Sequence, residues 1–280
     1  MRDQATGMRV LMRGYGETAV RPARPYVLTI TSGKGGVGKS TLSLNIGMAL
    51  ARFGKKVILL DADANLAGLD VMAGVAPRFR LGDVLRGDQD VDSVLVTLAP
   101  GLQLLPGSSG DPSYPLPTLE EQERLLADVL ERDARVDVVI IDTAARLTPE
   151  IIRYGEEADS VLVVTTPEPT AVMDAYAMVK ILGLNAPGQM VELVINNCRS
   201  VRDGEETYTK IRAAIRHFLG REVACAGIVP ADPRAGEAIR SQKALVNAFP
   251  HCAASLTIQS LAQTLLHDHV HASIHRTVAL

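Results

Sequence analysis

The chain has 280 residues, of which 47% are hydrophobic and 22% are charged, an ordinary balance for a folded protein that excludes wholesale disorder. No run of about 18 apolar residues occurs, so the sequence predicts no membrane-spanning helix. The formal net charge of −3 argues against a basic, nucleic-acid-binding surface over the whole molecule. The cysteines Cys198, Cys225 and Cys252 are far apart, which fits a reducing cytoplasm and offers no set of metal ligands.

Composition divides the chain into three regions. Residues 1–25 are polar and arginine-rich, and they end in a two-proline stretch typical of an extended linker. They lack the apolar core of a secretory signal. Residues 26–266 alternate apolar runs with helical patterns, and residues 267–280 are typical of a frayed helix end or tail. We therefore predict one large domain between two terminal segments.

Short apolar runs alternate with helical patterns through the middle region. The first run leads into a glycine-rich loop and then the helical pattern Thr41–Phe53, after which Gly54 supplies a helix stop. Continuous apolar strands between helices are typical of a parallel sheet covered on both faces. We therefore predict a doubly wound α/β domain with a mostly parallel sheet and ligands at the carboxyl ends of its strands. The runs are Tyr26–Thr31, Val57–Leu60, Val136–Ile141, Val161–Thr165, Val191–Asn196 and Val223–Val229.

The glycine-rich loop between the first strand and the first helix fits the pattern G-x-x-x-x-G-K-[ST]. Glycines let such a loop wrap around a phosphate, and the positive end of the following helix points at the same anion. We expect Lys39 to reach the β and γ phosphates of a nucleotide and Ser40 to ligate Mg²⁺. The loop also fits G-x-G-x-x-G, but a dinucleotide-binding fold gives no reason for Lys39 and Ser40. The residues assigned to nucleotide binding here are Gly33, Lys34, Gly35, Gly36, Val37, Gly38, Lys39, Ser40 and Thr41.

Lys34 is a second lysine inside this loop, and the run from Lys34 to Ser40 resembles the deviant Walker A motif of the MinD/ParA ATPase family. In that family the extra lysine crosses a dimer interface and touches the partner's nucleotide. The resemblance implies a P-loop ATPase fold, a homodimer that forms when ATP is bound, and a catalytic role for Lys34 beside Lys39. Without the flanking match, Lys34 would be interpreted as an exposed loop lysine.

Acidic residues end two of the predicted strands: Asp61 and Asp63 follow the second run, and Asp142 follows the third. Carboxylates at these positions face the phosphate loop, where they can hold Mg²⁺ or orient an attacking water. The resemblance implies that Asp63 polarises this water, that Asp61 has a metal or switch role, and that Asp142 lies near Mg²⁺. The alternative for Asp63 is a turn capped by its side chain.

The segment after Asp142 departs from the family pattern. The family usually continues with a glycine-containing switch, whereas this chain has Thr143-Ala144-Ala145-Arg146. Three alternatives stay open for Arg146, which are to pair with phosphate, to contact a partner subunit, or to face water. The departure bears on the rate of hydrolysis more than on nucleotide binding.

Asn196 ends the fifth apolar run and resembles the family position whose amide recognises adenine. A carboxamide offers one donor and one acceptor group to the edge of the base. Spacing alone does not separate Asn196 from Asn197, and either residue would also suit a turn. The segment containing Pro230 and Asp232 resembles the loop that closes over the base. We expect ATP rather than GTP because no N-K-x-D guanine motif is present.

The segment Thr165–Tyr176 resembles the FlhG/FleN group of flagellar number regulators within this family. In the broader family, the aspartate that matches Asp174 lies on a helix that packs across the dimer and contributes to partner binding. The spacing itself indicates only that a helix begins after Pro169.

The segment Asp3–Arg9 resembles the N-terminal D-Q-A-x-x-L-R motif of the same group. There the motif binds the GTPase FlhF as a helix and stimulates GTP hydrolysis, with its glutamine near the active site. The resemblance assigns partner contacts to Gln4, Met8 and Arg9. Met8 replaces leucine with little change in volume, whereas Gly7 weakens a short helix by about 1 kcal/mol relative to alanine.

The C-terminal region gives little support for a membrane anchor. Apolar residues recur at helical spacing up to Leu265, but packing of the last helix on a core explains them equally well. The tail beyond it carries only Arg276 as a fixed positive charge, whereas interfacial helices usually carry several. We therefore expect weak membrane binding or none.

Together these patterns predict a cytoplasmic, ATP- and Mg²⁺-dependent ATPase switch, at most peripheral at the inner face of the cell membrane. The resemblance implies slow, regulatory hydrolysis and control of flagellar number and placement. An FlhF-type GTPase is the expected partner, and a flagellar transcription regulator or switch-complex protein is a further candidate. No direct contact with nucleic acid is expected. The alternatives are a septum-site-determining MinD-like ATPase and a ParA-like DNA partition ATPase.

Overall fold

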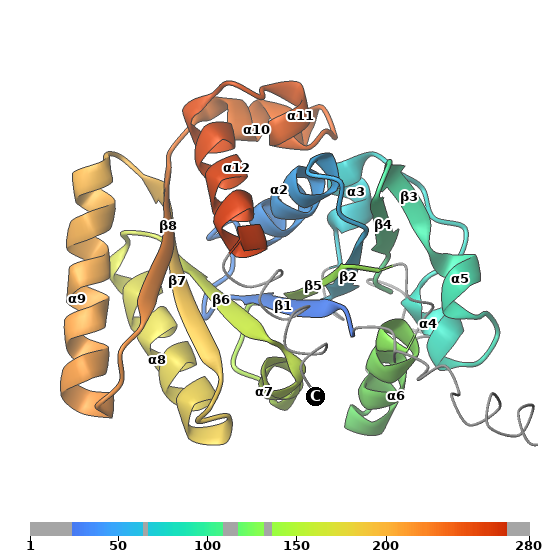
Figure 1. Cartoon of the computed structure of the whole chain (residues 1–280), viewed down its shortest axis with the longest axis horizontal. Helices are drawn as coiled ribbons and strands as arrows, with labels where there is room; N and C mark the ends of the chain where they lie inside the picture. Colours follow the sequence, from blue (N-terminus) through green and yellow to red (C-terminus); the bar gives the residue numbers. More distant parts are fainter. Residues whose placement is uncertain (1–23, 64–66, 109–116, 132–135, 268–280) are drawn as a thin grey trace, which may run out of the picture.

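The computed structural model describes residues 24–63, 67–108, 117–131 and 136–267. These residues form an eight-stranded sheet in the order β3-β4-β2-β5-β1-β6-β7-β8 (Figure 1). Neighbouring strands are parallel except β3 and β4, which pair antiparallel at one edge. The predicted doubly wound, mostly parallel architecture is confirmed. The strands are β1 (Tyr26–Thr31), β2 (Val57–Ala62), β3 (Val96–Ala99), β4 (Leu102–Leu105), β5 (Val138–Thr143), β6 (Ser160–Thr165), β7 (Met190–Cys198) and β8 (Ala224–Pro230).

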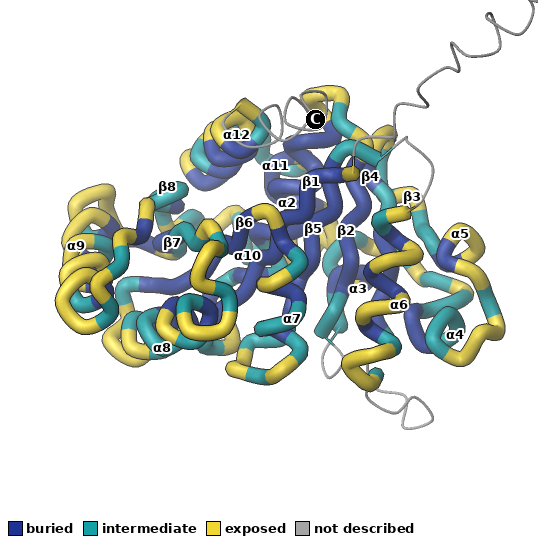
Figure 2. The backbone as a smooth tube through the Cα atoms, turned by 60° about the horizontal axis from the view of Figure 1, so that its bottom comes forward, coloured by how far each residue is buried: buried dark blue, intermediate teal, exposed yellow. Residues whose placement is uncertain are grey.

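Two layers of helices cover the sheet, one on each face (Figure 1). One core lies between the sheet and the layer of α2, α3 and α10–α12, and the other lies between the sheet and α4–α9. In Figure 2 the buried strands lie between helices whose outer faces are exposed. The helices are α2 (Lys39–Arg52), α3 (Leu69–Ala73), α4 (Leu81–Leu85), α5 (Val91–Val94), α6 (Leu119–Leu130), α7 (Pro149–Glu157), α8 (Pro169–Asn185), α9 (Val201–Leu219), α10 (Pro233–Arg240), α11 (Leu245–Ala248) and α12 (Ala253–Leu265).

The burial of strand β1 explains why its sequence is apolar without alternation. All of its residues are buried, with Leu28 and Ile30 in one core and Val27 in the other. A strand between two covered faces needs apolar side chains on both, so a continuous run replaces the alternating pattern of a half-exposed strand.

The β3–β4 hairpin is the part of the sheet that the sequence does not predict. Both strands have only four residues, and β3 at the edge is no more than half-buried. The turn between them needs Gly101, whose φ is 83° and where a Cβ would lie 2.8 Å from the Lys55 carbonyl oxygen. Short runs of this kind carry little apolar signal, because the pairing with β2 depends on distant residues.

The carboxyl ends of the parallel strands meet at one edge of the sheet, and the loops with the predicted site residues leave from that edge. The chain enters β1 at the opposite, amino ends of the parallel strands. There Arg24 donates a hydrogen bond to the Glu157 carbonyl at 2.7 Å. The predicted terminal segments lie largely outside the described residues. Within the described ranges, no helix combines the length and the apolar composition that crossing a bilayer requires.

Candidate functional site

The phosphate-binding loop joins β1 to α2 at the carboxyl edge of the sheet. Gly36 and Gly38 have φ values of 80° and 91°, in the left-handed region that glycine adopts at little cost. A Cβ on Gly38 would collide with the side-chain amide of Asn196. Two of the loop's glycines are therefore required by backbone geometry, and one also by the close approach of β7.

Lys39 begins α2 and its ammonium group is turned toward the sheet. Its Nζ lies 2.9 Å from Oδ1 of Asp142 and 3.1 Å from Oγ of Ser40. Lys39 is 6% exposed and Asp142 is 1% exposed, so this ion pair is shielded from water and strong only while both charges are present. A phosphate that binds Lys39 must compete with Asp142 for it.

Asp61 and Asp142 are direct neighbours across the parallel pair of β2 and β5. Asp61 accepts hydrogen bonds from the N–H groups of Gly68 at 3.0 Å and Leu69 at 3.1 Å. Its burial, and next the charge of Asp142, raise the pKa of the Asp61 carboxyl to about 7. Two buried carboxyl groups beside one lysine thus form an acidic centre that a cation would neutralise.

This acidic centre makes the stability of the nucleotide-free protein depend on pH. The pKa of Asp61 rises from about 3.9 in the unfolded chain to about 7 in the fold. Its stabilising contribution is thus complete below pH 4 and is lost as the pH rises through 7. We expect the melting temperature in EDTA to fall between pH 5 and pH 8, and Asp61→Asn to reduce that fall. Asp128→Asn, an exposed control on α6, should keep the wild-type dependence of the melting temperature on pH. The wild-type dependence in Asp61→Asn would contradict the raised pKa of Asp61.

The predicted magnesium ligands fit a divalent cation. Ser40, Asp61 and Asp142 converge beside Lys39 and supply only oxygen atoms, which are the ligands that Mg²⁺ prefers. Both hydrogen bonds to the Asp142 carboxylate are made at Oδ1, and no hydrogen bond reaches its Oδ2 from the part of the chain that the structure describes. This oxygen is therefore available to a metal ion.

Asp63 lies just beyond β2, where it is half-buried. Its backbone N–H is 3.4 Å from Oδ1 of Asp61, and the chain then leaves the described residues at 64–66. The position is at the correct edge of the sheet for a residue that orients water, and the role of Asp63 stays a prediction.

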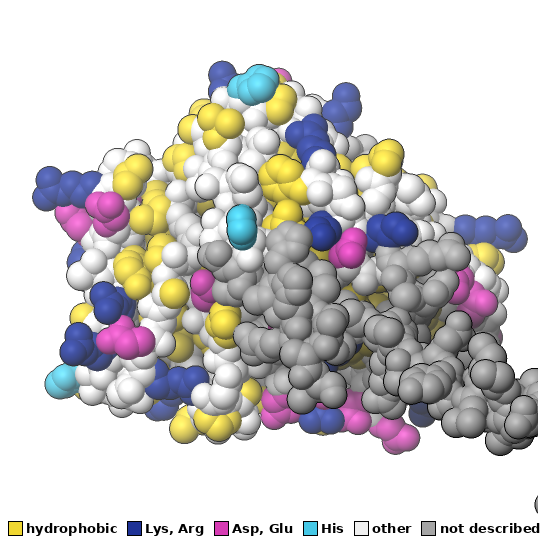
Figure 3. All heavy atoms as spheres, viewed as in Figure 1, with side chains coloured by type: hydrophobic (Ala, Val, Ile, Leu, Met, Phe, Trp, Pro, Cys, Tyr) yellow, Lys and Arg dark blue, Asp and Glu magenta, His cyan; other side chains and the backbone are white. Residues whose placement is uncertain are grey.

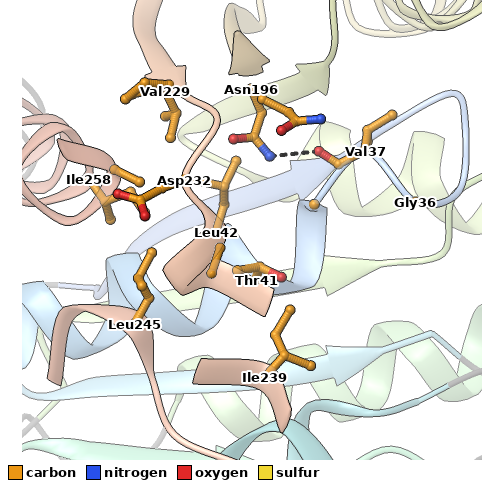
Figure 4. Close-up of a pocket in the computed structure, with 15 residues that line it drawn as sticks. Gly36, Val37, Thr41, Leu42, Asn196, Val229, Asp232, Ile239, Leu245 and Ile258 are labelled. Carbon is orange, nitrogen blue, oxygen red and sulfur yellow. Dashed lines mark hydrogen bonds between the residues drawn. The ribbon is translucent and has the colours of Figure 1, made fainter. Parts of the chain in front are cut away.

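A cavity of about 220 Å³ opens beside the phosphate loop. It brings the loop together with the predicted base-binding positions Asn196, Pro230 and Asp232, and with Asn197 (Figure 4). The apolar part of its wall comes from α2, β8 and α10–α12 and was not anticipated, because no motif marks these residues. The wall residues include Leu42, Val229, Ile239, Leu245 and Ile258. A cleft that is mostly apolar with a few polar groups suits a nucleobase.

Asn196 contacts the loop directly. Its Nδ2 donates a hydrogen bond to the Val37 carbonyl at 2.8 Å (Figure 4), so this donor holds the loop in the described structure. Asn197 has a φ of 56°, which fits the tolerance of asparagine for left-handed turns. Asp232 caps α10 by accepting from the Arg234 N–H at 3.0 Å. The choice between the two asparagines as adenine reader stays open.

The ammonium group of Lys34 is bound at the start of α8. Its Nζ lies 2.7 Å from the carboxylate of Glu168 and 2.9 Å from the hydroxyl of Thr170, at the start of α8. Lys34 and Glu168 are 37% and 65% exposed, so the pair is open to water and contributes little free energy. The lysine is therefore easily released toward another molecule.

Asp174 lies one turn further along α8 and is half-buried. A Cβ on Gly33 would lie 2.5 Å from the Asp174 carbonyl oxygen, so α8 packs directly on the beginning of the phosphate loop. This contact links the predicted partner-binding helix to the nucleotide site. Gln4, Met8 and Arg9 lie outside the described residues, and their partner roles stay predictions.

Arg146 follows β5 and is exposed. It has no ion pair or hydrogen bond with any residue that the structure describes, so none of its three alternatives is excluded. Thr143, three residues earlier, donates a hydrogen bond to the Thr31 hydroxyl at 3.0 Å. This contact ties the beginning of the switch to the end of β1.

An ion pair that the sequence does not indicate holds the segment after β2. Arg80 lies 2.7 Å from the buried carboxylate of Asp70 and donates to the Gly107 carbonyl at 3.0 Å. A Cβ on Gly107 would lie 2.8 Å from the Asp61 carbonyl oxygen. Arg80 thus supports the backbone beside the acidic centre, although no sequence pattern relates it to that centre.

Comparison with known proteins decides the family. The chain matches the CobQ/CobB/MinD/ParA nucleotide binding domain over residues 28–246. It is 33% identical over 237 residues to the antiactivator FleN of Pseudomonas aeruginosa, covering 85% of each chain. The chain belongs to the FlhG/FleN group of the MinD/ParA ATPase family. A second relative in this group is the flagellum site-determining protein YlxH of Helicobacter pylori, with 31% identity over 85% of this chain and 81% of that protein.

Solved structures of the MinD/ParA family share the fold. The cell division ATPase MinD of Pyrococcus furiosus has a TM-score of 0.73 at 26% identity, over 86% of this chain and 98% of that one. MinD in the MinC–MinD complex of Aquifex aeolicus has a TM-score of 0.70 at 28% identity, over 86% and 95% of the two chains. The predicted membership in this family is confirmed, whereas the roles of single residues in the FlhG/FleN site stay predictions.

Proposed function

We propose that this chain is an ATP-dependent dimerising switch that regulates flagellar number and placement, and that slow hydrolysis returns it to the monomer. The observation that carries this proposal is the position of Lys34 on the protein surface beside α8. A lysine held by an exposed ion pair with Glu168 is available to the nucleotide of a second copy. ATP then favours the dimer, because contacts to its γ-phosphate are made only there.

In this proposal the chain's own residues divide the work at the nucleotide. The loop N–H groups and Lys39 bind the phosphates, the cavity beside Asn196 receives adenine, and Asp63 orients the attacking water. Ser40, Asp61 and Asp142 hold Mg²⁺, which when bound neutralises charge on the phosphates. Two carboxyl groups buried beside one lysine support a cation at this position.

The flagellar role is proposed from the FlhG/FleN relatives and from the N-terminal motif. The relatives are named an antiactivator and a flagellum site-determining protein. These names support two kinds of partner, an activator of flagellar transcription and a component of the flagellar base such as the switch complex. The segment around Gln4, Met8 and Arg9 is proposed to bind an FlhF-type GTPase and to stimulate it. The place of action is the cytoplasm, with peripheral contact at the inner face of the membrane.

The test of the flagellar role is GTP hydrolysis by purified cognate FlhF. We expect the full-length protein and a synthetic peptide of residues 1–25 to stimulate it, and Gln4→Ala to remove most of the stimulation. The substitution lies outside the ATPase domain, so ATP binding by Gln4→Ala should equal that of the wild type. Lack of stimulation by the wild type with an active FlhF would contradict the flagellar assignment and leave a MinD/ParA ATPase.

Septum-site placement is the second candidate, because the MinD structures above share the fold at 26–28% identity. If this were the function, the protein would sediment with anionic liposomes in the presence of ATP. DNA partition of the ParA type requires a basic surface, whereas the face in Figure 3 carries basic side chains interspersed with acidic ones. Binding to non-specific DNA that weakens steeply with salt would favour this third function.

A further inference from the structure

Ser43 is a buried hydroxyl beside the predicted magnesium ligands that no motif includes. It lies on α2 one turn after Lys39 and is 0% exposed. Its Oγ is 2.7 Å from Oδ1 of Asp142 and 3.1 Å from the Lys39 carbonyl oxygen. A hydroxyl carries one hydrogen, and the shorter contact is to the charged acceptor, where hydrogen bonds are stronger.

Asp142 has two donors in the described structure, and a phosphate that binds Lys39 would take one of them away. Its Oδ1 accepts from both Lys39 and Ser43. When Lys39 turns to a phosphate, a carboxylate that is 1% exposed would keep only Ser43 among the described side chains. A buried carboxylate without a donor is costly. The hydrogen bond from Ser43 therefore stabilises Asp142 most when Lys39 has left it.

We propose that Ser43 is a positioning residue that stabilises the Asp142 carboxylate while Lys39 transfers to the nucleotide, before the metal compensates its charge. Both hydrogen bonds go to Oδ1, so neither Lys39 nor Ser43 occupies Oδ2. This inference rests on the proposed Mg²⁺- and ATP-dependent function.

The competing explanation is that Ser43 merely satisfies the carbonyl of its own helix. Buried hydroxyl groups in helices often bond to the residue one turn earlier. Thr207 on α9 does so, with its Oγ1 at 2.7 Å from the Asp203 carbonyl and 5% exposure. Thr207→Val is therefore a matched control that removes a helix hydroxyl bonded to a backbone carbonyl and, among the described residues, to no carboxylate.

The experiment measures ADP affinity of the full-length protein by calorimetry, once in EDTA and once in saturating Mg²⁺. We expect Ser43→Ala to weaken ADP binding about fivefold in EDTA and by less than about twofold with Mg²⁺. Ser43→Cys, whose thiol is a weaker donor, should lie between Ser43→Ala and the wild type, and it serves if the alanine variant fails to fold. Thr207→Val should match the wild type in both conditions.

A double-mutant cycle identifies the group through which Ser43 acts. In the background of Asp142→Asn, we expect Ser43→Ala to weaken ADP binding in EDTA by about twofold or less, because a neutral acceptor bonds the hydroxyl about half as strongly as a carboxylate does. An equal loss with and without Mg²⁺, no loss in EDTA, or a loss that is as large in Asp142→Asn as in the wild-type background would overturn the role of Ser43. No ADP binding by the wild type would instead overturn the proposed function, and this inference with it.

Discussion

Lys39→Ala is expected to lower nucleotide affinity at least about 100-fold, because a charged hydrogen-bonding group in a buried phosphate site contributes ~3 kcal/mol or more. The same substitution should also destabilise the nucleotide-free protein. Asp142 is 1% exposed and would lose the lysine that lies 2.9 Å from it. Breaking a buried ion pair at one partner costs about 3–5 kcal/mol. Calorimetric ADP titration and chemical unfolding measure the two effects.

A double variant separates the loss of stability from the loss of nucleotide binding. The double variant Lys39→Ala/Asp142→Asn removes both buried charges, so no unpaired charge remains. We therefore expect most of the lost stability to return while nucleotide affinity stays low. Lys210→Ala on α9, which removes an exposed lysine, should change neither quantity. A double variant as unstable as Lys39→Ala would contradict the arrangement of charges described here.

Asp142→Asn is expected to reduce ATP hydrolysis at least about 100-fold, because it replaces a charged magnesium ligand by a neutral one. In EDTA the same variant should bind ADP more tightly than the wild type. The amide oxygen of asparagine can still accept from Lys39 and Ser43, but neutral acceptors bind a lysine about half as strongly. The lysine is then released more easily to the phosphates.

These opposite effects on catalysis and binding are specific to the described geometry. A variant that was merely misfolded would lose both, and Asp128→Asn, an exposed acid on α6, should lose neither. Weaker ADP binding by Asp142→Asn in EDTA would show that Asp142 does not compete with the nucleotide for Lys39.

The sequence predicts those parts of the fold whose signals are local. The buried strand β1 and the phosphate loop depend on residues that are adjacent in the chain, so periodicity and one motif were enough to locate them. Strand β5 begins at Val138 rather than at the predicted Val136, because Asp137 and Val138 share the Lys56 carbonyl as acceptor, at 2.8 and 3.2 Å, in a contact that precedes the regular pairing with β2. That contact joins distant segments, and no local pattern contains it.

The site was predictable in its residue types but not in its contacts. Lys39 and Asp142 follow from motif and strand end, whereas Ser43 has no pattern and is recognised only by its distance from Asp142. The hydrogen bond between Asn196 and the Val37 carbonyl spans 159 positions of the chain. Pairings of this kind arise where α2 and the loop before it pack on the sheet that contains β7, which requires the assembled fold.

In the proposed switch, ATP joins two copies of the chain through Lys34. Its most direct test is the mass in solution, by light scattering, of a variant with Asp63→Ala that slows hydrolysis, in Mg²⁺-ATP and in Mg²⁺-ADP. We predict a dimer with ATP, a monomer with ADP, and a monomer in both when Lys34→Ala is added, with ATP binding by the monomer retained. A mass that does not depend on the nucleotide, or an ATP dimer that forms equally well with Lys34→Ala, would contradict ATP-dependent dimerisation through Lys34.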